Sequence, residues 1–218
     1  MTKTDTQLKL DVDTELVWEP KINAAQIAVT VTDGAVLLTG VVDTYAQKWA
    51  AMDAAMRVSG VRSIVERLAV EVLPHHTRSD AEIAAAVERS LKWDVLIPRS
   101  ITATVHEGVV TLFGQVTWNF QRTSAERSIE RHTGIVAVMN EITLAPDVST
   151  GDVKAKIETA LRRQATTESD NIHVGTRGNL VTLTGHARSW GAVRDARNAA
   201  WAVPGVTQVV DQLTIVHD

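Results

Sequence analysis

Apolar and polar positions along the chain follow one order of spacings, and this order occurs three times. Each copy opens with apolar residues four positions apart, which places them on one face of a helix. Polar residues that can cap a first helical turn precede each set, for example Thr4/Asp5 and Ser79/Asp80. The sets are Leu8, Val12 and Leu16; Ile83, Val87 and Leu91; and Val153, Ile157 and Leu161. The pattern predicts an amphipathic helix at the start of each copy.

Two strands joined by a tight turn follow each helix. Apolar residues alternate with other residues from Ile27, Ile101 and Ile172 onward, and a period of two is typical of a strand with one buried face. Asp33-Gly34 and Glu107-Gly108 then predict two-residue hairpins, whereas Arg177-Gly178-Asn179 predicts a three-residue loop. The second strands bury Val36 and Leu38, Val110 and Leu112, and Val181 and Leu183.

Glycines at matching positions mark the turns and caps of this unit. One glycine ends each second strand, and another lies 20 residues further along the chain. The interval predicts a second helix that starts near residues 44, 118 and 189, with a small, alanine-rich inner face and a glycine cap. A third strand follows. The turn and cap glycines are Gly34, Gly40, Gly60, Gly108, Gly114, Gly134, Gly178, Gly185 and Gly205.

Each unit therefore has the order α-β-β-α-β and belongs to a mixed α/β (α+β) fold class. The third strand is expected to run parallel to the second, with two helices on one face of a three-stranded mixed sheet. The predicted domains are residues 1–73, 79–145 and 150–218, joined by linkers at 74–78 and 146–149. A unit of about 70 residues has a small core, so neighbouring units are expected to pack together and share stability.

Composition excludes several classes of protein. The chain has 218 residues and no cysteine, which rules out a disulfide scaffold, a thiolate zinc site and a cysteine nucleophile. It has no apolar run that could span a bilayer and no signal peptide at Met1, so cytoplasmic residence is expected. Its net charge of −4 argues against nucleic acid as a partner.

Candidate catalytic chemistry is sparse. His75-His76 lies beside Pro74 in a linker, and solvated linker residues explain the pair better than a metal site. The sequence contains no nucleophile elbow, no phosphate-binding loop and no dinucleotide fingerprint. We therefore predict no enzymatic activity, catalytic residue, metal site or cofactor.

Tryptophan is unusually frequent: six of the nine aromatic residues are tryptophan. Trp18 and Trp93 end the first helices, and others lie on or near the second helices. These rings are expected to close the small cores or fill the seams between units, with surface anchoring as the alternative. The third unit has a net charge of +1, against −3 and −2 for the first two. Four of its residues form a candidate lipid or partner contact: Trp190, Arg188, Arg194 and Arg197.

The repeated pattern resembles the BON (bacterial OsmY and nodulation) domain family. The matching segments include residues 29–40 with their two counterparts, Arg57-Val58-Ser59-Gly60-Val61, Ala202-Val203-Pro204-Gly205-Val206 and Val138-Met139-Asn140-Glu141-Ile142. The resemblance covers nearly the whole chain as three tandem copies. The third copy departs from the other two in its turn, and it has Gln164 where they have Trp18 and Trp93.

The resemblance implies a non-enzymatic binding protein of envelope or osmotic-stress physiology. Its expected partner is anionic phospholipid or a membrane-associated protein, bound weakly. The alternative function is a protein–protein scaffold or a stress-protective, chaperone-like module. Family members that are exported make the periplasm the alternative compartment. The sequence does not determine the oligomeric state.

Overall fold

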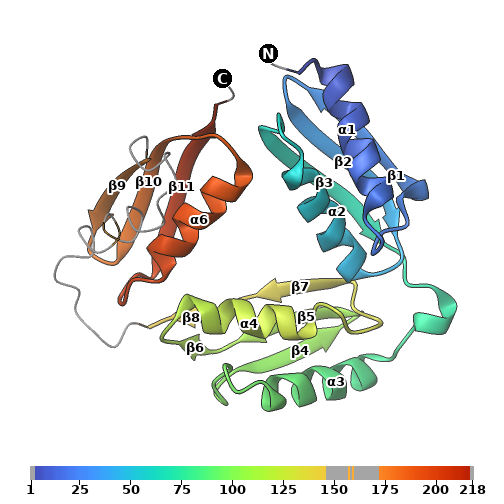
Figure 1. The fold of residues 1–218 in the computed structure, drawn as a ribbon. Helices are drawn as coiled ribbons and strands as arrows, with labels where there is room; N and C mark the ends of the chain where they lie inside the picture. Colours follow the sequence, from blue (N-terminus) through green and yellow to red (C-terminus); the bar gives the residue numbers. More distant parts are fainter. Residues whose placement is uncertain (1–2, 146–156, 158, 160–171, 217–218) are drawn as a thin grey trace. The chain divides into compact units, whose positions relative to one another are not determined.

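The computed structural model describes residues 3–145, 157, 159 and 172–216. The chain forms two compact units, Met1–Gly114 with Ser124–Glu141, and Gln115–Thr123 with Ile142–Asp218. The described residues form three mixed three-stranded sheets and one short two-stranded sheet (Figure 1). The α+β fold class predicted from the sequence is confirmed.

The first copy of the repeat shows the complete order of elements. Its helices are α1 (Asp5–Trp18), the short 3-10 helix η1 (Ala24–Gln26) and α2 (Tyr45–Arg57), and its strands are β1 (Ile27–Thr32), β2 (Ala35–Val42) and β3 (Ser63–Val70). Strand β2 lies at the centre of the sheet, antiparallel to β1 and parallel to β3. Helix α1 packs on β1, and α2 packs on β2, β3 and α1.

The second copy repeats this order with a break in two of its strands. Its elements are η2 (Pro74–His76), α3 (Asp80–Trp93), β4 (Thr102–His106), β5 (Val109–Phe113), β6 (Gln115–Val116), α4 (Asn119–Ile129), β7 (Ala137–Asn140) and β8 (Thr143–Leu144). Strand β5 lies between β4 and β7, and β6 pairs with β8. The break between β5 and β6 falls at Gly114, where an added Cβ would lie 2.8 Å from the Ser100 carbonyl oxygen.

The described part of the third copy contains β9 (Ile172–Arg177), β10 (Leu180–Ala187), α6 (Trp190–Trp201) and β11 (Gln208–Ile215). Strand β10 lies between antiparallel β9 and parallel β11. The first helix predicted for this copy falls mostly outside the described residues. Ile157, from that segment, is fully buried in the core of the third copy.

Burial follows the predicted stripes. Leu8, Val12 and Leu16 of α1 and Ile83, Val87 and Leu91 of α3 are buried, and so are the paired residues of the central strands. The second helices press small side chains against the sheets: Ala51, Ala54 and Ala55; Ala125 with Ile129; and Ala196, Ala199 and Ala200. Small residues allow this close approach, and each buried Leu, Val or Ile stabilises the fold by about 1.5–3 kcal/mol.

The turns differ from the predicted ones in the third copy. In the first two hairpins both turn residues have positive φ, at 51° and 76° for Asp33 and Gly34 and at 49° and 74° for Glu107 and Gly108. The predicted three-residue loop at Arg177 is wrong, because Arg177 pairs with Leu180 and leaves only Gly178 and Asn179 in the turn. Gly178 has a φ of 57° at the first turn position, which is the arrangement of a II′ turn. All nine glycines named from the sequence have positive φ.

Candidate interaction surfaces

An aspartate on each of α1 and α3 holds the hairpin of the same copy. The two carboxylate oxygens of Asp80 accept hydrogen bonds from the backbone N–H groups of Glu107 and Gly108, at 2.8 and 2.9 Å. Asp5 makes the same pair of bonds to Asp33 and Gly34, at 2.8 and 3.0 Å. The bonds from Gly108 and Glu107 hold the pKa of Asp80 below its usual value. The carboxylates of Asp5 and Asp80 therefore serve to hold the turns in place.

The first and second copies join their two helical segments differently. In the first copy Arg57 bridges α2 to α1 through Glu15 and Glu19, each at 2.9 Å, and it also pairs with Asp53. The hydrogen bond from Arg57 lowers the pKa of Glu19. In the second copy Ser90 Oγ lies 2.7 Å from His132 Nε2. Burial, together with the nearby charge of Arg89, lowers the pKa of His132.

The Ser90–His132 pair was not predicted, because its members are separated by 42 residues and no local motif joins them. Among the described residues no group of three or more His, Asp or Glu side chains could hold a metal ion. No helix within the described ranges is long and apolar enough to cross a bilayer.

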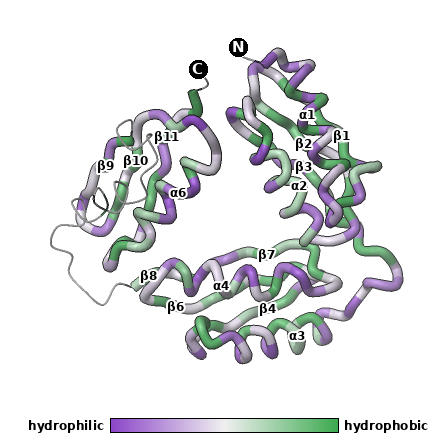
Figure 2. The backbone as a smooth tube through the Cα atoms, in the orientation of Figure 1, coloured by the Kyte–Doolittle hydropathy of each residue, from purple (hydrophilic) through white to green (hydrophobic). Residues whose placement is uncertain are grey.

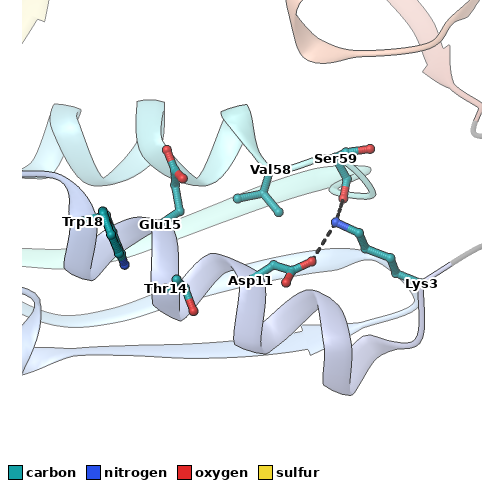
Figure 3. A pocket seen from close by; sticks show the side chains of 7 residues that line it. All are labelled: Lys3, Asp11, Thr14, Glu15, Trp18, Val58 and Ser59. Atoms are coloured by element: carbon teal, nitrogen blue, oxygen red, sulfur yellow. Dashed lines mark hydrogen bonds and ion pairs between the residues drawn. The ribbon is translucent and has the colours of Figure 1, made fainter.

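An open groove lies beside α1 in the first copy (Figure 3). Its volume is about 440 Å³. The Lys3 side chain closes one end, where its Nζ pairs with Asp11 at 2.6 Å and donates to the Ser59 carbonyl at 3.0 Å. The Trp18 ring stands at the other end. Thr14, Glu15 and Val58 also line the groove, so polar, acidic and apolar groups share one surface.

The structure corrects the expected role of two tryptophans. Trp18 is 79% exposed and Trp93 is 81% exposed, so neither ring closes the core of its copy. Trp18 and Trp93 are the last residues of α1 and α3, at positions beyond the buried stripes. The core interpretation holds for Trp201, which packs against the core of the third copy. Tyr45, at the start of α2, is buried, and burial raises its pKa.

Trp93 belongs to an exposed apolar corner with a basic border. Val95 and Leu96 in the following loop are 96% and 50% exposed, and Figure 2 colours this loop as hydrophobic. Arg89 and Lys92 near the end of α3 and Arg99 in the loop are basic, whereas Glu88 and Asp94 are acidic. All three basic residues are exposed. We call residues Arg89, Lys92, Trp93, Val95, Leu96 and Arg99 the α3 corner.

The candidate contact named from the sequence lies on the third copy. Trp190 begins α6, and Arg194 and Arg197 follow it at intervals of four and three, which places the three on one side of the helix. Arg188 precedes them just after β10. Trp190 is partly buried, whereas the arginines are exposed. The buried residues of α6 are Val193, Ala196, Ala199 and Ala200.

Comparison with known proteins identifies the repeated unit. The model of the BON domain matches residues 4–72, 79–146 and 149–217. The chain belongs to the BON domain family. The three-copy BON prediction from the sequence is thereby confirmed. The glycine pattern that led to it matches backbone positions where φ is positive.

Individual relatives are more distant. The chain is 30% identical, over 125 residues, to an uncharacterised protein in the gshII 5′ region of Anaplasma centrale, covering 54% of this chain and 83% of that protein. Among solved structures it is similar to CdsD, a structural protein of the type III secretion system of Chlamydia trachomatis, at 15% identity and a TM-score of 0.27, over 97% of this chain and 93% of the other. The periplasmic domain of PrgH from S. typhimurium gives 12% identity and a TM-score of 0.22, over 88% and 94%.

Proposed function

We propose that this BON protein is a non-enzymatic binding protein of envelope or osmotic-stress physiology that associates weakly with anionic phospholipid. The observation that carries the proposal is the α3 corner, where Trp93, Val95 and Leu96 are exposed together. Folding alone does not account for three large apolar side chains in water at one corner. An indole and two aliphatic side chains beside cationic groups suit the boundary between lipid headgroups and acyl chains.

The charge around the corner supports the same ligand. Arg89, Lys92 and Arg99 exceed the two acidic groups Glu88 and Asp94 by one charge. Each basic residue near an anionic membrane surface contributes about 1 kcal/mol. Lys92 pairs with Glu88 at 2.6 Å on the same exposed helix face, and such a surface pair is weak enough to exchange for a headgroup phosphate. The predicted association is therefore weak and sensitive to salt.

The arginine-bearing face of α6 is the second surface for this function. Trp190, Arg194 and Arg197 share one side of α6, and Arg188 lies just before it. Trp190 offers less apolar area than Trp93 because it is partly buried. We therefore place the α3 corner first and the α6 face second. The proposal holds equally for a chain in the cytoplasm and for one in the periplasm.

Sedimentation with liposomes tests this function. The full chain should pellet with vesicles in proportion to their anionic lipid content, and moderate salt should weaken the association. Absence of binding at every composition and at low salt would overturn the lipid proposal. If binding occurs and survives replacement of Trp190 by Ala and Arg188, Arg194 and Arg197 by Gln, the α6 face is excluded as the contact.

A further inference from the structure

Helix α1 carries a second apolar stripe on its exposed side. Leu8, Val12 and Leu16 are buried against the sheet, yet Leu10 and Val17 are 65% and 71% exposed. Leu10 and Val17 are seven residues apart, two turns of the helix, and therefore lie one above the other. Trp18 lies about 100° around the helix from Val17 and borders the stripe on the side of the groove. Helix α1 is thus apolar on two sides, and the fold uses one of them.

The second copy shows that the fold does not require the outer stripe. Helix α3 has the same length of 14 residues, the same capping box and the same exposed tryptophan at its end. At the positions that correspond to Leu10 and Val17, α3 has Ala85 and Lys92. The two helices share what folding needs, so the extra apolar residues of α1 are a property of the first copy.

Charge around the stripe selects its partner. The acidic residues on and beside α1 exceed the basic residues that pair with them by two: Asp11, Asp13, Glu15, Glu19 and Asp53 against Lys3, Lys9 and Arg57. Asp11 and Asp13 follow Leu10 closely and lie toward the two flanks of the stripe. Two such acidic faces would repel each other in a symmetric pairing of α1 with α1, and an anionic membrane would repel one of them. The apolar stripe and the acidic residues beside it together favour a partner that carries both apolar and basic side chains.

We propose that the outer face of α1, formed by Leu10, Val17 and Trp18 with Asp11 and Asp13, docks a basic amphipathic helix of a partner protein. Apolar residues of the partner would cover the Leu10–Val17 stripe, and its flanking Lys or Arg would meet the two aspartates. Those aspartates now pair with Lys3 and Lys9 at 2.6 and 2.5 Å. Exposed pairs of this kind contribute little and can be exchanged.

The groove beside α1 extends this surface. Trp18 borders both the stripe and the groove, and Asp11 lies at the other end of the groove in the pair with Lys3 (Figure 3). A long cationic side chain from a helix lying on α1 could enter the groove over Val58 and Thr14. There its charge would share Glu15 with Arg57, and its apolar stem would contact the Trp18 ring.

Binding of a designed peptide to the full chain tests the proposal. The probe is a helical peptide of about 18 residues with leucine on one face and lysine on its flanks. One control peptide has Glu in place of each Lys, and another has Ser in place of each Leu. The variant is Leu10→Ala with Val17→Ala, because alanine keeps the helix and both sites are exposed. Trp93→Ala is the matched control on the second copy.

The basic amphipathic peptide should bind the chain, and both control peptides should bind much more weakly. The double variant should weaken binding at least about tenfold, whereas Trp93→Ala should leave it unchanged. Equal binding to the double variant, or equal binding of the acidic peptide, would overturn the proposal. So would a dimer of the chain that the double variant dissociates, or loss of vesicle binding in that variant, because another copy or a membrane would then be the occupant.

Discussion

Asp80 fixes the hairpin of the second BON copy through the backbone N–H of Gly108, which donates to the aspartate at 2.9 Å. The backbone N–H of Glu107 donates a second hydrogen bond to the same carboxylate, so the interaction is bidentate. One residue at the start of α3 thereby positions a turn 28 residues further along the chain. Asp5 and Gly34 repeat the relationship in the first copy, at 3.0 Å.

Asp80→Asn should destabilise the second copy, because the amide has one acceptor oxygen and no charge for two N–H donors. The pKa of Asp80 is lowered in the fold, so its contribution is complete above the unfolded pKa of about 3.9 and is lost as pH falls through the lowered value. Denaturant unfolding from pH 7 to 3 should show a smaller loss of stability for the variant. A loss equal to that of the parent chain would contradict the assignment. Asp13→Asn, which removes one exposed ion pair, is the control.

Gly108→Ala should be more damaging than Gly178→Ala. Both glycines have positive φ, at 74° and 57°, and alanine there costs about 1–2 kcal/mol. A Cβ on Gly108 would also lie 2.8 Å from the Gly134 carbonyl oxygen, whereas a Cβ on Gly178 would meet nothing within 4 Å. Free energies of unfolding from guanidinium titrations should therefore differ beyond the common cost. Equal losses would show that the contact at Gly108 relaxes freely.

Burial of His132 should make the second copy sensitive to mild acid. The pKa of His132 is lowered in the fold, so the unfolded chain binds more protons below its own pKa of about 6.5. Stability contributed by this site is therefore present above that value and is lost as pH falls through the lowered one. Thermal melts at pH 7.5 and 5.5 should differ less for His132→Gln than for the parent chain. An unchanged difference would place the acid sensitivity elsewhere.

The BON copies should stabilise one another, as expected for units of about 70 residues. Residues 1–73 alone should melt at a lower temperature than the same copy in the full chain. Circular dichroism gives the melting temperature of each protein. Hydrogen exchange of the β2 amides then compares the stability of this copy in isolation with its stability in the full chain. An isolated copy that is as stable as the intact chain would contradict this prediction.

The fold could be predicted from the sequence because its determinants are local. Stripes such as Leu8, Val12 and Leu16, and turns such as Asp33-Gly34, report periodicity and φ within a few residues. The prediction for the third turn was wrong because Arg177 can either extend the strand or enter the loop. Only its pairing with Leu180 decides between the two. The core role predicted for Trp18 and Trp93 was wrong for a different reason. A tryptophan beyond a buried stripe is apolar whether it packs or not, and only three-dimensional exposure separates the two roles.

The candidate binding surfaces could be predicted only in part. The arginines near Trp190 stand out in the sequence because they are concentrated in one segment. The α3 corner does not, because Val95 and Leu96 look like ordinary core residues until their exposure is known. The Ser90–His132 bond depends on a contact between distant segments and has no signal in either segment alone.

Vesicle binding by three matched tryptophan variants tests the central proposal most directly. Trp93→Ala, Trp18→Ala and Trp190→Ala each remove one indole, at the α3 corner, at the acidic face of α1 and at the α6 face. We predict that Trp93→Ala weakens binding to anionic vesicles by about tenfold, a change of about 1.4 kcal/mol, while Trp18→Ala leaves it unchanged and Trp190→Ala has the smaller effect. Full binding by Trp93→Ala would contradict the assignment of the α3 corner as the membrane contact.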